Sequence, residues 1–168
     1  NKAYPNLEEV ILVWKTHCDI GYTHPVPEVL NYYRTGMMDG ALKLIDESST
    51  LPENQRFMWM LPAWVMERIL DEKQDSARRI RIEKAIGQDR LIWHALPFTF
   101  ESEASDLEEL VRCLGSGTRL STQFGQALPT DAKQPDTPDQ AWVRPSLRPN
   151  AGVSFAHFCV NLCVLTHS

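Results

Sequence analysis

Apolar residues recur along the chain in short runs that alternate with stretches of helical spacing. The run "EVILVWKTH" at positions 9–17 is almost continuously apolar and rich in β-branched residues. Such a run is typical of a strand that is buried on both faces. Shorter runs follow at 56–62 and 91–97, and two further strands are expected at 132–134 and 153–161. The pattern therefore predicts five strands.

Stretches of helical spacing separate these strands. The segment 27–48 brings apolar residues onto one face, and Gly36 and Gly40 are expected to weaken this helix or divide it in two. Farther on, Pro145 and Pro149 predict a broken helix, because proline disrupts a helix interior. Strands that alternate with helices predict an α/β protein with a parallel sheet.

Capping residues mark the predicted helix ends. Leu70 is expected to end one helix, and Ser76 to cap another that runs to Gly87. Ser105, with Glu108 three residues later, predicts a capping box at the start of a third helix. The glycines of "LGSG" are expected to stop that helix.

Two side chains that can bind a metal lie where the first apolar run ends. His17 and Asp19 alternate with Cys18, so both point to the same side of an extended strand. Sites in parallel α/β folds are built at the carboxyl ends of the strands. An imidazole and a carboxylate about 6–7 Å apart along a strand can both bind one zinc ion. The spacing equally fits two side chains that bond to loop amides.

Several segments together resemble glycoside hydrolase family 38, the α-mannosidase family, and in particular a bacterial branch of it. These segments are "KTHCDIGYTHP", "RFMWMLPAWVMERIL", "HALPFTFESEASDLEELVRCLGSG", "LSTQFGQALPTDAKQPDTP" and "NAGVSFAHFCVN". The resemblance implies part of a (β/α) barrel of the glycoside hydrolase and deacetylase type. A barrel of this type takes about 200 residues or more. We therefore expect residues 1–168 to be a single N-terminal portion of the catalytic barrel, one that is not closed.

The resemblance also implies a chemistry and its residues. It assigns a zinc ion to His17, Asp19 and Asp136, and makes Asp136 the nucleophile of a retaining glycosidase. The family's remaining histidine ligand and its general acid fall outside the matched segments and are assigned to no residue here. His94 and Glu103, near the end of the third strand, are candidates for contact with a carbohydrate substrate. A role for His94 in the core is equally compatible with the sequence.

Two other functions stay open. A metal-dependent polysaccharide deacetylase would use similar ligands, although the helix-borne histidine pair typical of those enzymes is missing from the sequence. A truncated, non-catalytic carbohydrate-binding domain is favoured by the segment "DTPDQA". There, Asp139 and Gln140 stand where the related sequences have glycine and histidine.

Composition and charge argue against two classes of partner, nucleic acids and membranes. The net charge is -5 and the sequence has no basic stripe, so we expect no nucleic-acid partner. The longest apolar stretch, 151–165, is shorter than the roughly 20 residues of a membrane span, so we expect no membrane partner either. The chain opens on Asn1 rather than Met, so the start of the gene product is missing or removed. A signal peptide ahead of Asn1 would make the protein periplasmic or secreted, and the compartment is left open. The oligomeric state is left open.

Overall fold

The computed structural model describes residues 8, 10–16, 18, 20–21, 23–137 and 141–159. The strands are β1 (Trp14–Lys15), β2 (Trp59–Pro62), β3 (Leu91–His94), β4 (Asp131–Pro135) and β5 (Phe155–Cys159). The helices are α1 (Val26–Tyr32), α2 (Met38–Ser48), α3 (Ala63–Ile69), α4 (Ser76–Gly87), α5 (Leu107–Cys113), α6 (Gly115–Phe124) and α7 (Arg144–Asn150). The elements thus follow the alternating order that the sequence predicts.

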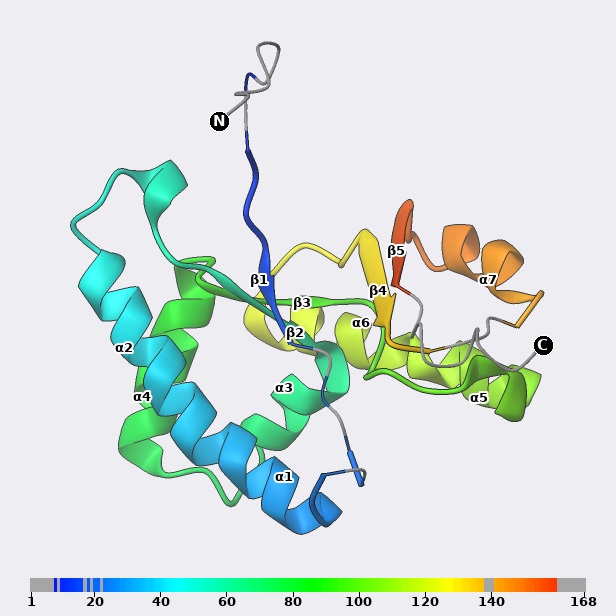
Figure 1. Ribbon diagram of the computed structural model, residues 1–168, viewed down its shortest axis with the longest axis horizontal. Coiled ribbons are helices and arrows are strands. Elements are labelled where there is room, and N and C mark those ends of the chain that lie inside the picture. Colours follow the sequence, from blue (N-terminus) through cyan, green and yellow to red (C-terminus); the bar gives the residue numbers. More distant parts are fainter. Residues whose placement is uncertain are drawn as a thin grey trace, which may run out of the picture.

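All strand pairs are parallel. β1, β2 and β3 form a three-stranded sheet in that order, and β4 pairs with β5. The backbone N–H of Ala95, just after β3, donates to the carbonyl of Asp131 at 2.9 Å and links the two sheets. Figure 1 shows α1–α4 gathered around β2 and β3, and α5 and α7 beside β4 and β5. Helix α6 reaches under β3, where Leu120 joins the main core and the Ser121 hydroxyl accepts a bond from the Trp93 indole. The predicted α/β fold with parallel strands is confirmed, and the sheet does not close within the described residues.

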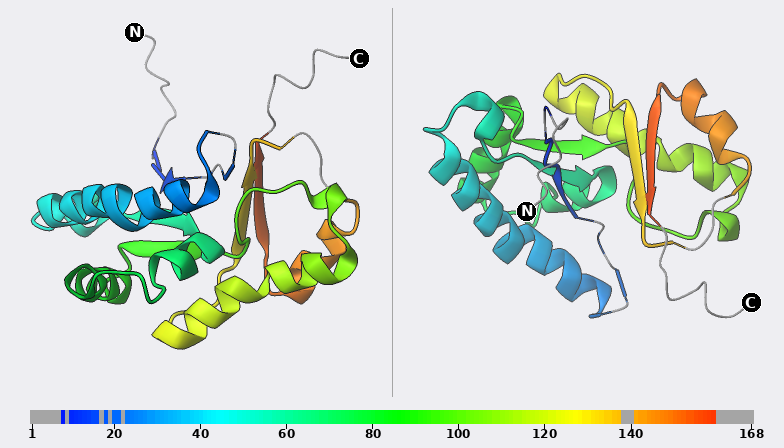
Figure 2. Two further views of the ribbon diagram at one scale, coloured as in Figure 1. Left: turned by 90° about the horizontal axis from the view of Figure 1, so that it is seen from below. Right: turned by 45° about the horizontal axis from the view of Figure 1, so that its top comes forward.

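The main core lies between β2, β3 and the helices α1–α4. Its fully buried side chains include Met38, Leu61, Met66, Ile69, Ile82, Ile86 and Leu91. A smaller apolar cluster lies beyond β3 and consists of Ala95, Leu96, Ala132 and Val153, with Phe100 and Leu114 packed against it. Two further views show the same separation of the first helices from the last ones (Figure 2). The core therefore holds β2 and β3 firmly, and these two strands support the site described below.

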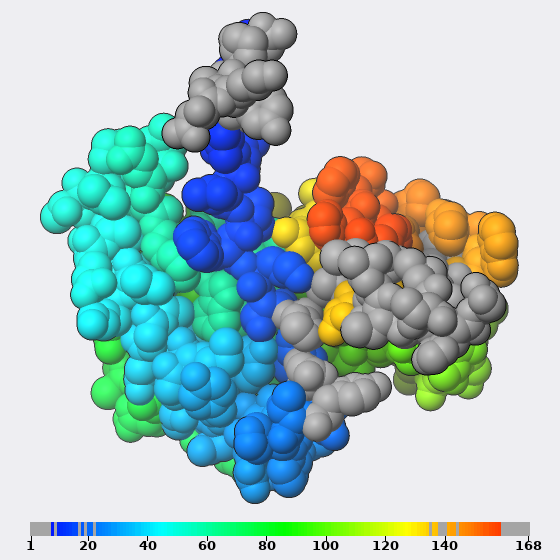
Figure 3. All heavy atoms as spheres, viewed as in Figure 1, coloured from blue at the N-terminus to red at the C-terminus, as the bar shows by residue number. Residues whose placement is uncertain are grey.

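The first apolar run is the main departure from the prediction. It was expected to be buried on both faces, but the side chains from Val10 to Trp14 are between 52% and 76% exposed. β1 pairs with β2 over two residues, and no other described segment pairs with its second edge. Figure 3 shows this dark blue segment on the surface of the molecule. The run remains exposed because nothing in the described part of the chain covers it.

The first helical segment is continuous rather than divided. α1 passes through a π-helical turn, Tyr33–Met37, directly into α2. Gly36 lies in this turn, and a Cβ there would come within 2.9 Å of the Tyr32 ring. Single π-helical turns of this kind are frequent near functional sites. The glycine therefore marks a local change of helical pitch instead of a helix end.

Two predicted caps are wrong by one residue. α4 is capped by Asp75 rather than Ser76, and the Asp75 carboxylate accepts a backbone N–H bond of 2.9 Å from the third residue after it. α5 is capped by Asp106 rather than Ser105, and Glu109 completes the capping box. Aspartate and serine are about equally good N-caps, so sequence does not decide between adjacent candidates.

The glycines of "LGSG" correctly predict the end of α5, at Cys113, but the sequence pattern does not predict the helix α6 that follows at once. Gly115 instead begins α6, and Gly117 lies where α6 packs closely against the chain after β3. A Cβ on Gly117 would come within 2.9 Å of Pro129 and 3.4 Å of the Ala95 backbone. The helix ends later, at Gly125, whose φ of 63° is the left-handed conformation typical of a glycine C-cap. Gly117 thus permits close packing of α6, and Gly125 ends the helix.

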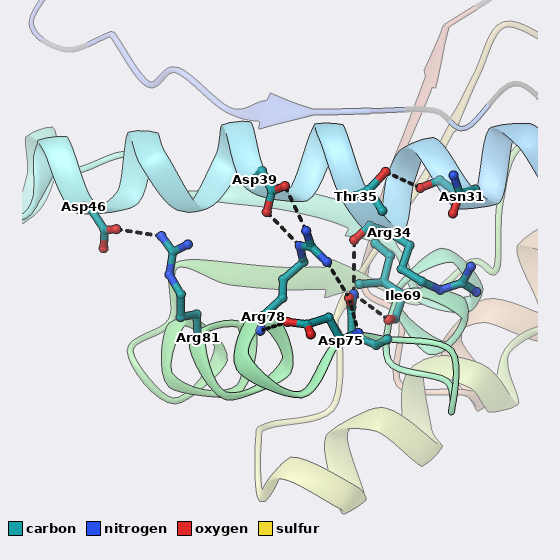
Figure 4. A network of polar contacts seen from close by, with 10 residues as sticks. Asn31, Arg34, Thr35, Asp39, Asp46, Ile69, Asp75, Arg78 and Arg81 are labelled. Atoms are coloured by element: carbon teal, nitrogen blue, oxygen red, sulfur yellow. Dashed lines mark hydrogen bonds and ion pairs between the residues drawn. The ribbon is translucent and has the colours of Figure 1, made fainter.

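Polar contacts join α2 to α4 and to the end of α3 (Figure 4). The Arg78 guanidinium donates to both carboxylate oxygens of Asp39, at 2.7 and 3.0 Å, and the Arg81 guanidinium donates to Asp46 at 2.8 Å. Gln74, which precedes the α4 N-cap, donates to the backbone carbonyls of Arg34 in the π-helical turn and of Ile69 at the end of α3. These contacts fix the helices that cover β2 and β3. Among the described residues, no helix is long and apolar enough to cross a membrane.

Candidate functional site

Three of the predicted site residues lie at or beyond the carboxyl edge of a parallel strand. His94 is the last residue of β3, Glu103 lies in the turn that follows it, and Asp136 comes directly after β4. His17 and Asp19 lie outside the described residues. In parallel α/β folds this edge is where ligands bind. The candidate site therefore consists of the residues at or after the carboxyl ends of β1, β3 and β4.

The exit of β1 is held by the core. The Tyr33 hydroxyl lies 2.7 Å from the Thr16 hydroxyl, and Tyr33 itself is buried. Burial raises the pKa of Tyr33 to about 12, so its hydroxyl keeps its proton at neutral pH. Tyr33 comes from the π-helical turn, whose altered pitch sets its position. The residue just before His17 is thus anchored to the helix layer.

Cys18 shows an unusual backbone at the same exit. It is buried and has a φ of 53°, in the left-handed region that residues with a Cβ seldom adopt. Such conformations cost about 1–3 kcal/mol and are concentrated at binding and catalytic sites. The prediction of an extended strand through Cys18 is therefore wrong, and the alternation expected to bring His17 and Asp19 to one side does not hold at this residue.

Asp136 lies at the corresponding position on β4. It is exposed and has a φ of 63°, a conformation that aspartate tolerates better than most residues. The strand end below it is fixed by Gln134, a fully buried side chain that donates to the carbonyl of Phe100 and lies 3.5 Å from the Thr137 hydroxyl. A rigid strand end therefore presents the Asp136 residue to solvent.

Glu103 lies in a short 3-10 turn, Ser102–Ala104, and is exposed. The turn is tied to the chain beyond Asp136, because the Ser102 hydroxyl, which is fully buried, accepts a 2.9 Å bond from the backbone N–H of Ala141. The 3-10 turn and the chain after β4 are thus joined by a direct hydrogen bond. Glu103 remains a candidate for contact with a substrate at this joined rim.

His94 is buried at the end of β3, with 2% of its surface exposed. Burial, helped by the positive charges of Lys133 and Lys15, lowers the pKa of His94 to about 3. The ring is therefore neutral under ordinary conditions, and its Nδ1 has no hydrogen-bond partner among the described residues. Its burial favours the core role that the sequence left open, and contact with substrate stays a prediction.

The predicted zinc ligands cannot be compared as a set. No group of three or more histidine, cysteine, aspartate or glutamate side chains suited to a metal occurs within the part of the chain that the structure describes. Two of the three predicted ligands, His17 and Asp19, lie outside that part. Zinc binding therefore stays a prediction from the resemblance.

Sequence reasoning missed two residues of this edge. Tyr33 was assigned to an apolar helix face, and nothing in the sequence indicates its bond to Thr16. Trp142 lies after β4 and is 94% exposed, the most exposed of the large apolar side chains described. A signal for Trp142 was available, since it is the tryptophan that stands in a proline-rich segment rather than in an apolar run.

Comparison with solved structures places the fold among known ones. The structure of an α-mannosidase from Enterococcus faecalis V583 is similar to this chain, with a TM-score of 0.71 and 20% sequence identity. The likeness covers 87% of this chain and 16% of the mannosidase chain, so this chain spans a small part of that protein's length. The amino-acid sequence matches no protein-family model, and no curated protein matches it significantly. The comparison shows a shared fold.

Proposed function

We propose that this chain is the N-terminal portion of a zinc-dependent retaining glycoside hydrolase that acts on α-mannosides or related glycans. The observation that carries the proposal is the likeness of fold to an α-mannosidase over 87% of the chain. Within that fold, Asp136 follows β4 as an exposed carboxylate residue on a fixed strand end. A nucleophile at a strand exit needs this combination of exposure and rigid support.

Asp136 is the proposed nucleophile. A retaining glycosidase uses one carboxylate to attack the sugar and a second group, about 5–5.5 Å away, to protonate the leaving oxygen. Its left-handed backbone sets Asp136 off from the extended strand before it, so the residue lies at the rim rather than in the ladder. The proton donor is assigned to no residue of this chain.

The proposed zinc ligands are His17, Asp19 and Asp136. One nitrogen and two carboxylate oxygens are a donor set that suits zinc. A zinc ion bound there would polarise sugar hydroxyls and keep the nearby carboxylates ionised. The anchor from Tyr33 at the exit of β1 supports the proposal, because a metal site requires ligands that are held in place.

The test uses the natural full-length protein and an aryl α-mannoside. We expect the substitution Asp136→Asn to lower kcat by at least about a thousandfold, as loss of a nucleophile does. The control is Asp89→Asn. Asp89 is also an exposed aspartate with positive φ, at 56°, but it lies at the entry of β3, on the opposite edge. Equal activity of the Asp136→Asn and Asp89→Asn variants would refute the assignment.

Metal analysis tests the zinc proposal separately. We expect about one zinc ion per wild-type chain and a large loss of zinc in His17→Ala, with a folded protein by circular dichroism. A wild-type protein that holds no zinc and hydrolyses the substrate would remove the metal from the proposal. Release of acetate from an acetylated polysaccharide, with no release of sugar, would favour a deacetylase instead.

A further inference from the structure

Trp142 is an exposed indole in an unusual place. Tryptophan is highly buried on average in folded proteins, yet the Trp142 side chain is 94% exposed. By comparison, Trp59 and Trp93 are buried in the core, with 6% and 7% of their surface exposed. Trp142 therefore contributes almost nothing to packing within the described fold. Its exposure requires another explanation.

The backbone beside Trp142 is held at the candidate site. Ala141, the residue before it, donates its N–H to the buried hydroxyl of Ser102 at 2.9 Å. Trp142 itself lies just before helix α7, two residues ahead of Arg144. The indole is thus displayed from a segment that is bonded to the 3-10 turn at Ala141 and continues into helix α7. A fixed display lowers the entropy cost of binding a ligand.

The chemistry around the indole indicates what it binds. The turn to which its segment is bonded carries two exposed carboxylate residues, Glu101 and Glu103. A protein interface would surround a tryptophan anchor with contacts that exclude water. A pyranose ring instead offers an apolar face of C–H groups for the indole and a rim of hydroxyls that donate to carboxylates. An isolated aromatic ring on a segment that is bonded to an acidic turn therefore suits a sugar better than a protein.

We propose that Trp142 is a stacking platform for a sugar ring of a glycan bound at the exits of β3 and β4. This inference rests on the proposed function and adds to it a second sugar position, outside the reacting one. It predicts that oligosaccharides bind more tightly than single sugars. The exposed Glu101 and Glu103 would accept hydrogen bonds from the hydroxyls of the same ring.

The test measures binding of a sulfur-linked α-manno-trisaccharide, which resists hydrolysis, to the natural full-length protein by calorimetry. We expect Trp142→Ala to raise Kd about tenfold, the usual effect of removing an aromatic stacking partner. Trp142→Phe keeps an aromatic face and should stay within about threefold of wild type. The matched control is Trp14→Ala, because Trp14 is also exposed, at 57%, but lies on β1. It should leave Kd unchanged.

Three results would overturn the inference. Equal Kd values for wild type and Trp142→Ala, or no binding by wild type, would do so. So would self-association of wild type that Trp142→Ala abolishes, because the indole would then belong to an interface. The hydrolysis assay separates this inference from the proposed function. Hydrolysis that depends on Asp136 together with binding that ignores Trp142 would leave the function standing, whereas binding through Trp142 without hydrolysis would leave the platform standing.

Discussion

Two apolar segments of this molecule have similar composition and opposite surroundings. The side chains of 10–14 are more than half exposed, whereas Leu91 and Trp93 of β3 are buried. β3 pairs with β2 on one edge and is linked to β4 on the other through the bond from Ala95 to Asp131. Among the described residues, β1 has one neighbouring strand, β2, and pairs with it over two residues. An apolar run thus predicts a strand, but its burial depends on what lies on both edges.

The burial of a strand and the burial of the residues at its carboxyl end differ in β1. β1 is exposed along its length, yet Thr16 at its end is bonded to the buried Tyr33, and Cys18 is itself buried. β3 is buried along its length and ends in a buried histidine, His94. The exits of both strands are therefore fixed, whatever the burial of the strand that leads to them. The predictions below test this contrast in order of expected effect.

The largest expected difference is between two tryptophans. Trp93 packs in the core and its indole N–H donates to the Ser121 hydroxyl at 3.1 Å. Trp93→Ala should lower the free energy of unfolding by about 3–5 kcal/mol through a core cavity. Trp14→Ala should lower it by less than about 1 kcal/mol, as a surface substitution does. Urea unfolding of the natural protein measures both. A similar loss for both would mean that β1 is covered in solution.

A second contrast lies in the response to pH at the end of β3. His94 has a folded-state pKa of about 3, below the 6.5 of an exposed histidine, so between these values the unfolded chain binds more protons. Stability is therefore full above pH 6.5 and falls as the pH drops toward 3, by about 1.4 kcal/mol per pH unit. From pH 6.5 to 5 the loss is about 2 kcal/mol. His94→Gln should flatten this slope, and an unchanged slope would mean that the ring is solvated.

The sequence predicts a strand well where a short apolar run lies between turn residues. β2, β3 and β5 lie within the predicted segments, because short apolar runs between turn residues leave little choice, and β4 extends one residue beyond its predicted segment at each end. α6 was missed since Gly115 and Gly117 have the same local signature whether they end a helix or permit close packing. The exposure of β1 depends on its neighbours, which a local pattern does not contain.

In the candidate site, the sequence predicts the position of one residue along the chain but not the surroundings of the others. The placement of Asp136 after β4 follows from the segment that resembles the mannosidase family, and the structure has it at that strand exit. The neutral state of His94 depends on burial and on Lys15 and Lys133, from two other strands. The anchoring role of Tyr33 depends on a π-helical turn that no residue pattern announces. Geometry between distant segments is what sequence reasoning lacked.

The smallest expected effect concerns the anchor of the β1 exit. Tyr33→Phe removes the hydroxyl that bonds to Thr16 and should lower the free energy of unfolding by about 1 kcal/mol. Tyr32→Phe is the matched control, because Tyr32 is 59% exposed and one residue away, and it should have almost no effect. If the exit of β1 is fixed by this bond, Tyr33→Phe should also weaken zinc retention against a chelator, while Tyr32→Phe should not. Equal zinc retention in both variants would show that the β1 exit is held by its other contacts, and the contrast between an exposed strand and its fixed exit would then rest on Cys18.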